Sequence, residues 1–229
     1  AIFWLWKYTK DYRNILKFLA SGILTLVFSL LLHISISAGP VLISAQGGIN
    51  FFIGNHVESD GMTARFPGLG AGWGWDQVRA TAENTAQASL NASQIDRYYW
   101  AEGIKLIKTD PVHILKHTWR KARLFWNRIE VSNNRDLYYH GNSFPLIGWL
   151  MWIGFPLFMP LAIAAAASNL KNRNIQLLTL FIIVQYFTII PFFVNARFRH
   201  PLTPLMIILS LGSIRILIEL IKRKANLLK

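Results

Sequence analysis

The stretch ILKFLASGILTLVFSLLLHISI, residues 15–36, decides the fold class because it is almost wholly apolar. A helix of about 20 such residues covers roughly 30 Å, which is the thickness of the hydrocarbon core of a bilayer. Three further stretches of the same character follow at 144–166, 175–194 and 202–221. The sequence therefore predicts an all-α integral membrane protein with four transmembrane helices.

Basic residues mark one end of each apolar stretch. They stand before or at the start of the first stretch, between the second and third, and after the fourth, at Lys7, Lys10, Arg13, Lys17, Lys171, Arg173, Lys222, Arg223 and Lys224. Because basic residues favour the cytoplasmic side, both chain ends are predicted to be cytoplasmic. The cytoplasmic segments are then 1–14, 167–174 and 222–229, and the exported ones are a large loop domain at 37–143 and a short turn at 195–201.

The composition agrees with a membrane protein. Hydrophobic residues make up 53% of the chain and aromatic residues 14%, which is too apolar for an ordinary soluble domain. The formal net charge of +13 indicates contact with membrane lipids or a phosphorylated lipid rather than nucleic acid. The chain has no cysteine, which excludes disulfides and thiolate metal sites.

The N-terminal residues are typical of the end of an earlier helix. The chain starts at Ala1 and continues with an aromatic and aliphatic run at 2–6. We therefore expect segment 1–14 to contain the end of a preceding transmembrane helix, and the chain to be the C-terminal part of a longer protein. The stretch 15–36 is too long for a signal-peptide core and is expected to stay in the membrane.

The exported loop contains three kinds of sequence. Residues 39–75 are rich in glycine, proline and asparagine, which predicts turns and irregular backbone. Residues 76–108 are typical of helix, with Ser93 as the expected N-cap and Asp96 three residues later. Asp110 precedes a proline and predicts the start of a further helix, with the aspartate as N-cap.

An apolar stripe follows that proline at helical spacing. Its members are Leu115, Trp119, Ala122, Trp126 and Ile129, and basic residues occupy much of the remaining surface. A tryptophan-bearing stripe with basic flanks is typical of a helix that lies in the membrane interface. The same stripe also suits the core of the exported domain, and both interpretations stay open.

Few polar side chains lie inside the apolar stretches. Arg215 and Glu219 are one helical turn apart and predict an ion pair within the last helix. His33 and Gln185 are isolated, which is more typical of hydrogen bonds between helices than of a transport path. A channel or transporter needs polar faces on at least two spans, and the sequence does not offer them.

A first candidate site lies at 47–61, directly after the first apolar stretch. Its candidate residues are Gly48, Asn50, Asn55, His56, Glu58 and Asp60. Asparagine amides and backbone N–H groups beside glycine bind sugar hydroxyls or phosphate oxygens. The acids suit a base or a metal ligand; with His56 they are compatible with a divalent cation but do not demand one. The alternative is an ordered turn in which asparagine and glycine adopt positive φ.

A second candidate site is the basic turn at 195–201. Arg197, Arg199 and His200 lie at the outer end of the third stretch, against the positive-inside pattern. Guanidinium groups bind phosphate through paired hydrogen bonds, and a lipid headgroup phosphate lies at this depth. The turn therefore predicts a phosphate site, with anchoring to outer-leaflet headgroups as the alternative.

Three motifs in order resemble one family. Residues 47–61 contain Gly-Gly-x-Asn-Phe-x-Ile-Gly-Asn-x-x-Glu-x-Asp-Gly, residues 119–130 contain Lys-x-x-x-Phe-Trp-Asn-x-x-Glu, and residues 196–204 contain Ala-Arg-Phe-Arg-His-Pro-Leu-x-Pro. Together they resemble bacterial membrane glycosyltransferases of family 39, relatives of the dolichyl-phosphate-mannose protein mannosyltransferases with the GT-C fold. His200 stands where that family usually has leucine, and nothing in the sequence explains this departure.

The resemblance implies a transferase that moves a sugar from a polyprenyl-phosphate donor to an envelope or protein acceptor. The reaction is then expected on the outer face of the cytoplasmic membrane of a bacterium, with the large loop periplasmic or extracellular. Arg197 and Arg199 then correspond to binders of the donor phosphate, with His200 beside them. The residues at 47–61 resemble loop residues of the family, and the resemblance assigns them no role. The family's catalytic acid lies in its first exported loop, so it is expected upstream of this chain, and the chain alone is expected to be inactive.

A second interpretation is a non-catalytic membrane module that binds or assembles components for envelope polysaccharide synthesis. This module would need no catalytic acid, so it accounts for the absence of that acid without requiring a missing upstream segment. A reading frame that continues upstream with more spans and an acidic exported loop would favour the transferase. A start codon at or just before Ala1 would favour the module.

Overall fold

All regular elements in the described part of the chain are helical, apart from one isolated bridge between Phe66 and Gly70. The all-α prediction is therefore confirmed for these residues. A computed structural model describes residues 2, 6–7, 10–36, 39–41, 43–127, 144, 146, 154–169, 171–213 and 218. The chain forms two compact units, the first of Ala1–Asp60 and Ala64–Lys116, the second of Gly61–Thr63 and His117–Lys229.

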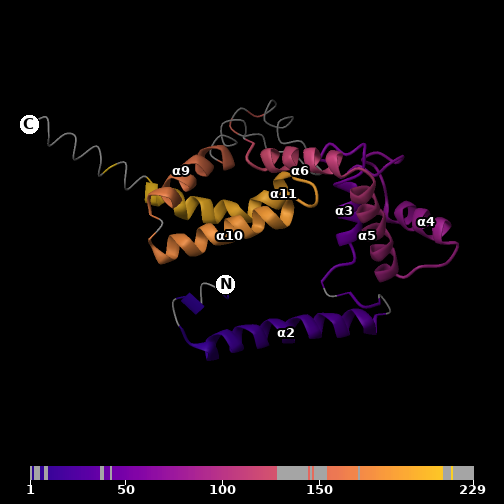
Figure 1. Ribbon diagram of the computed structural model, residues 1–229, viewed down its shortest axis with the longest axis horizontal. Coiled ribbons are helices and arrows are strands. Elements are labelled where there is room, and N and C mark those ends of the chain that lie inside the picture. The colour runs from indigo at the N-terminus through magenta and orange to yellow at the C-terminus, as the bar shows by residue number, and fades with distance from the viewer. Residues whose placement is uncertain are drawn as a thin grey trace, which may run out of the picture. The chain divides into compact units, whose positions relative to one another are not determined.

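The first unit contains the long helix α2 (Tyr12–Ser35), drawn in indigo in Figure 1. Asp11 caps this helix, and its carboxylate accepts the Arg13 N–H at 2.9 Å. No residue of α2 is buried, and its leucine, isoleucine and phenylalanine side chains are exposed all round the axis. Such a helix is better suited to lipid than to water. Among the described residues, α2 is the one helix long and apolar enough to cross a membrane.

Helix α3 (Gly47–Ile53) packs closely on α5 (Ala92–Thr109). Gly48 permits the approach, because an added Cβ would overlap the backbone oxygen of Asp96. Further along the contact, the Phe51 ring lies over Gly103 and stacks on Trp100 with ring centroids 4.5 Å apart. The two helices bury the side chains of Ile49, Phe51, Ile53, Ile95 and Tyr99.

Segment 76–108 is divided between two helices. Helix α4 (Trp75–Ala86) ends at Gln87, whose φ of 51° lies in the left-handed region, and α5 starts five residues later. Tyr99 joins them, because its hydroxyl donates to the Val78 carbonyl oxygen at 2.7 Å. This hydrogen bond is buried, so it satisfies two polar groups that water does not reach.

The prediction of Ser93 as the N-cap of α5 is wrong. Asn91 caps the helix: its side-chain oxygen accepts the Gln94 N–H at 3.0 Å, and the Gln94 side chain accepts the Asn91 N–H at 2.8 Å. This reciprocal pair satisfies two N–H groups that the first helical turn leaves open. Ser93 is buried instead, and Asp96 accepts the Gly48 N–H.

Helix α6 (Pro111–Phe125) begins where the sequence predicts. The Asp110 carboxylate accepts the His113 N–H at 2.9 Å, which is the bond of an N-cap aspartate to the third helical residue. The proline occupies the first helical position, where its missing N–H leaves no acceptor unsatisfied. The predicted start of this helix is therefore confirmed.

The buried face of α6 differs from the predicted stripe. Its buried residues are His117, Lys121 and Phe125, spaced by four. Leu115 and Trp119 of the stripe are 72% and 66% exposed. The core interpretation is therefore wrong for these two residues, whereas the membrane-interface interpretation stays a prediction.

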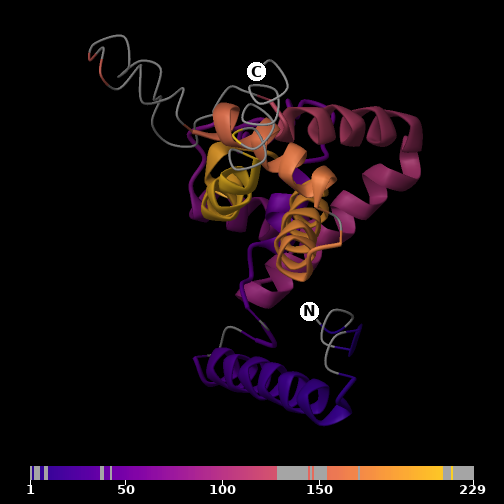
Figure 2. The ribbon, with the colours of Figure 1, turned by 90° about the vertical axis from the view of Figure 1, so that its left-hand side faces the viewer.

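The core of the second unit lies among α9 (Phe155–Ser168), α10 (Arg173–Ile189) and a helical segment at 203–213. Figures 1 and 2 show α10 and segment 203–213 side by side, connected through the short helices α11 (Ala196–Arg199) and η2 (His200–Leu202). The buried core comprises Phe125, Phe155, Ala162, Ala165, Ile182, Ile189, Val194, Leu202, Met206 and Leu209.

Of the other three predicted spans, 175–194 is the one that lies wholly within the described residues, and its helix α10 is 17 residues long. Helix α9 begins at Phe155, and residues 145 and 147–153 of its predicted span lie outside the described residues. Helix α10 ends at Ile189 because Pro191 has no N–H and its ring clashes with the preceding turn. Both helices are apolar, but at 1.5 Å per residue they cover only about 21–26 Å. The four-span topology stays a prediction, and the Arg215–Glu219 pair lies outside the described residues.

Candidate functional site

The first candidate segment, 47–61, begins as a helix rather than as a loop. Gly48 and Asn50 lie in α3, and the Gly48 N–H donates to Asp96 Oδ1 at 2.6 Å. Burial raises the pKa of the Asp96 carboxyl. Within this fully described segment, positive φ occurs only at Gly61 (φ 75°). Glycine at position 48 therefore serves a close helix contact and not a left-handed turn.

Asn55 and His56 are buried and bind the backbone around them. The Asn55 side-chain amide donates to the Phe51 carbonyl oxygen at 2.7 Å. His56 Nδ1 accepts the Glu58 N–H at 3.1 Å, and its Nε2 lies 3.0 Å from the Arg65 carbonyl oxygen. Those two contacts require a proton on Nε2 alone, which is the neutral ring. Burial lowers the pKa of His56, in agreement with this form.

The two acids of the segment are more open to ligands. Glu58 is exposed, and Asp60 is half-buried. In the described part of the chain, no three histidine, aspartate or glutamate side chains are grouped so that they could hold a metal ion. The hypothesis of a divalent cation thus depends on these two carboxylates.

The second candidate segment forms α11 and η2 at the C-terminal end of α10. Asn195 caps α11 by accepting the Phe198 N–H at 3.3 Å. Arg197 and His200 are exposed, whereas Arg199 is 1% exposed. The structure therefore separates the three predicted phosphate binders into two exposed side chains and one buried cation.

Arg199 is held by backbone carbonyl groups. Its Nη1 donates to the Phe125 carbonyl oxygen at 3.0 Å and to the Asn127 carbonyl oxygen at 2.6 Å. Its guanidinium carbon lies 4.5 Å from the centre of the Phe155 ring. The carbonyl groups stand at the C-terminal end of α6, where the helix leaves them without internal partners and the helix dipole is negative. Arg199 thus stabilises the end of α6 from a distant part of the sequence.

Sequence reasoning misses Lys121, which is fully buried. Its Nζ donates to the Phe192 carbonyl oxygen at 2.8 Å and to the Pro191 carbonyl oxygen at 3.4 Å. Burial lowers the pKa of Lys121 to about 7. The signal that could have found it is the spacing of His117, Lys121 and Phe125, which places all three on one face of the helix.

Gly61, the last residue of the first motif, lies beside Lys121 within the second unit. The Val194 N–H donates to the carbonyl oxygen of Gly61 at 2.8 Å. A Cβ on Gly61 would lie 2.8 Å from Lys121 Cγ, and its φ of 75° also favours glycine. Lys121 itself belongs to the second motif, and Val194 lies two residues before the third. One residue of the first motif, Gly61, is thus in contact with Lys121 and with the residue Val194.

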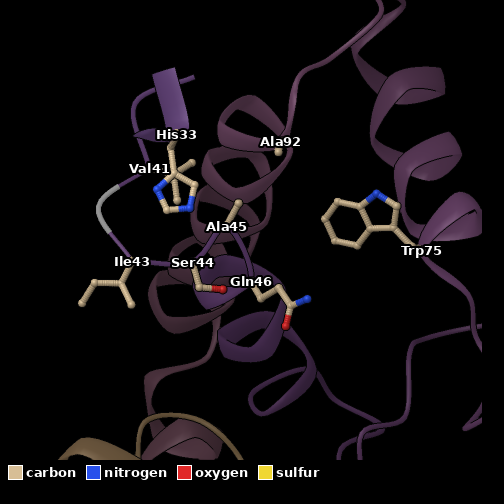
Figure 3. A pocket seen from close by; sticks show the side chains of 8 residues that line it. All are labelled: His33, Val41, Ile43, Ser44, Ala45, Gln46, Trp75 and Ala92. Atoms are coloured by element: carbon tan, nitrogen blue, oxygen red, sulfur yellow. The ribbon is translucent and has the colours of Figure 1, made fainter. Parts of the chain in front are cut away.

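A pocket of about 310 Å³ lies in the first unit, and Figure 3 shows its lining. Trp75 stands on one side, Gln46 and Ser44 lie in the middle, and His33 is on the other side. An indole, an amide and a hydroxyl are groups that can hold a small polar ligand such as a sugar. His33 Nδ1 lies 2.8 Å from the Ser29 carbonyl oxygen of its own helix, so the predicted bond to another helix is not observed for this ring.

No protein-family model, no curated protein and no solved structure matches this chain significantly. The family resemblance therefore depends on the three sequence motifs alone.

Proposed function

We propose that this chain forms the donor-phosphate end of a membrane glycosyltransferase. Its donor would be a sugar linked to polyprenyl phosphate, and its acceptor an envelope or protein hydroxyl on the outer face of the membrane. The observation that carries the proposal is the burial of Arg199 against the Phe125 and Asn127 carbonyl oxygens. That contact fixes the turn on which Arg197 and His200 are exposed.

The proposed role of Arg197 is electrostatic. In transfer, the acceptor oxygen forms a bond to the anomeric carbon, and the bond from that carbon to the phosphate oxygen breaks. Polyprenyl phosphate leaves with the bonding electrons, so negative charge on the phosphate increases in the transition state. A guanidinium beside the phosphate stabilises this charge, and a protonated His200 would add to it. The base that accepts the hydroxyl proton is not assigned to a residue of this chain.

A non-catalytic binding or assembly module is the second candidate. The contacts of the 47–61 segment favour it: Asn55 and His56 bind backbone groups around them, and Gly48 is used for helix packing. These side chains maintain the fold of the first unit. A module of this kind would hold the lipid-linked sugar without breaking its bond to phosphate.

The test is sugar transfer in proteoliposomes that contain the protein as its gene encodes it and a radiolabelled polyprenyl-phosphate sugar. Loss of a hydrogen bond to a charged phosphate weakens binding by about 10–100-fold. We expect Arg197→Gln and His200→Gln each to lower transfer by about that factor at low donor concentration. Lys105→Gln, which removes an exposed lysine of α5, is the matched control and should leave transfer unchanged.

Three results separate the candidates. Transfer that depends on Arg197 supports the transferase. Donor binding that depends on Arg197, without transfer by the unmodified protein, supports the module. Equal binding and transfer by Arg197→Gln and the unmodified protein would overturn both proposals.

A further inference from the structure

Helix α6 has two faces of different character. His117, Lys121 and Phe125 form its buried face. Away from them, Val112, Leu115 and Trp119 are 60%, 72% and 66% exposed. At 100° per residue, these three apolar side chains lie within about 60° of one another. The most apolar face of α6 is therefore exposed in the described part of the chain.

Basic residues occupy one edge of the uncovered face. Lys116, Arg120 and Arg123 are exposed, and their directions centre about 75° from that of the apolar side chains. Helix α6 has no acidic residue. The exposed surface of this helix is thus amphipathic and carries charge of one sign.

We infer that the face formed by Val112, Leu115 and Trp119 lies in the headgroup region of an anionic membrane, with Lys116, Arg120 and Arg123 on the lipid phosphates. Apolar side chains of such a helix enter the boundary between headgroups and acyl chains. Lysine and arginine extend their apolar stems along that boundary and keep their charges at the phosphates. This inference does not depend on the transferase proposal.

Two observations favour a membrane over a protein partner. The same chain contains α2, which has the length and composition to cross a bilayer. A helix tethered to a spanning segment meets the membrane surface at a high effective concentration, so weak contacts suffice. The basic edge also matches the negative surface of anionic lipids.

The absence of cysteine from the sequence makes a spin-label test direct. Single substitutions Leu115→Cys, Thr85→Cys and Leu24→Cys would be labelled with a nitroxide in the full chain, reconstituted with purified lipid and no other protein. Thr85 is an exposed residue of α4 and serves as the aqueous control; Leu24, 71% exposed on α2, serves as the lipid control. Collisions with oxygen and with a water-soluble nickel chelate report the depth of each label.

The label at Leu115 should resemble that at Leu24 in vesicles of phosphatidylglycerol and phosphatidylcholine, with oxygen collisions exceeding nickel collisions. In pure phosphatidylcholine, or with Lys116→Gln and Arg120→Gln together, the label should become shallower and nickel collisions should rise at least twofold. The inference would be overturned if the label at Leu115 behaved like the label at Thr85 in every vesicle. It would also be overturned if the label at Leu115 were shielded from both oxygen and the nickel chelate. Equal depth in both kinds of vesicle would overturn the requirement for anionic lipid.

Discussion

Arg199 Nη1 donates to the Phe125 carbonyl oxygen at 3.0 Å, although the two residues are 74 positions apart in sequence. Both side chains are buried, and the Arg199 guanidinium also lies against the Phe155 ring. A buried guanidinium loses its hydration, so it is stable only where carbonyl groups and an aromatic face replace water. Arg199 is thus a structural cation in the second unit, whatever the exposed Arg197 binds.

Replacement of Arg199 should therefore destabilise the fold. Arg199→Gln removes charge-assisted hydrogen bonds to one buried and one partly buried carbonyl group and leaves space beside Phe155. We expect a loss of about 2–4 kcal/mol in the free energy of unfolding, which corresponds to roughly 5–10 °C in the unfolding temperature. Tryptophan fluorescence during heating of the detergent-solubilised protein measures it.

Arg197→Gln is the matched control for that experiment. It removes the same type of charge two residues away, but Arg197 is exposed. Its unfolding temperature should stay within about 2 °C of the unmodified protein, since exposed substitutions change stability by only about 0.5 kcal/mol. Equal effects of the two substitutions would show that Arg199 is not a structural cation.

Lys121 should make stability depend on pH. Burial lowers its pKa in the folded protein from 10.5 to about 7. Between these values the unfolded chain binds a proton that the folded chain lacks, so stability rises with pH across this window. From pH 7.5 to 9 the gain is up to about 2 kcal/mol. Below pH 7 both states are protonated, and the folded state carries the full penalty of a buried charge.

Unfolding temperatures of the unmodified protein and of Lys121→Met, measured from pH 6.5 to 9.5, isolate this effect. The difference between the two should shift in favour of the unmodified protein as pH rises. Lys116→Met changes an exposed lysine of the same helix, and its difference from the unmodified protein should be flat. A flat difference for Lys121→Met as well would show that Lys121 keeps its ordinary pKa.

Local signals in the sequence predict much of the fold. The apolar stretch at 15–36 became α2, and Asp110 before a proline fixed the start of α6, because length, capping and proline geometry are properties of neighbouring residues. The prediction of the N-cap of α5 failed because serine and asparagine are both good N-cap residues. Asn91 is the cap because Ser93 packs into the interior and the Gln94 side chain accepts the Asn91 N–H.

The site depends on contacts that no local pattern reveals. Helical spacing shows that Lys121 and Phe125 share a face, but not that this face is the buried one. The apolar stripe through Leu115 and Trp119 looked the better candidate for a core, but these two side chains are exposed. The buried Lys121 ammonium group donates to the carbonyl oxygens of Pro191 and Phe192, which lie 70 and 71 positions further along the chain, just after the end of α10.

Gly48 should be indispensable for packing of the first unit. A Cβ at this position would overlap the Asp96 backbone oxygen and lie 2.9 Å from the Trp100 nitrogen. Both are backbone atoms of α5 and cannot rotate away. Gly48→Ala should therefore separate α3 from α5, with a loss of about 3 kcal/mol or more, seen as rapid proteolysis of the loop domain.

Gly72→Ala is the control for Gly48→Ala, because a Cβ at position 72 has no atom within 4 Å. Its proteolysis should match that of the unmodified protein. If Gly48→Ala were equally resistant, the close contact of α3 with α5 would be wrong, and a ligand-binding role for Gly48 would regain support.

The capping of α5 offers a test that compares neighbouring residues. Asn91→Ala removes the acceptor of the Gln94 N–H and should cost about 1 kcal/mol, whereas Ser93→Ala keeps the buried Cβ and removes no capping bond. Hydrogen exchange of amides in the first turn of α5 should rise about fivefold in Asn91→Ala, because 1 kcal/mol corresponds to that factor in the opening equilibrium. In Ser93→Ala, exchange of these amides should stay near that of the unmodified protein. Faster exchange in Ser93→Ala than in Asn91→Ala would restore Ser93 as the cap and shift the start of α5 by two residues.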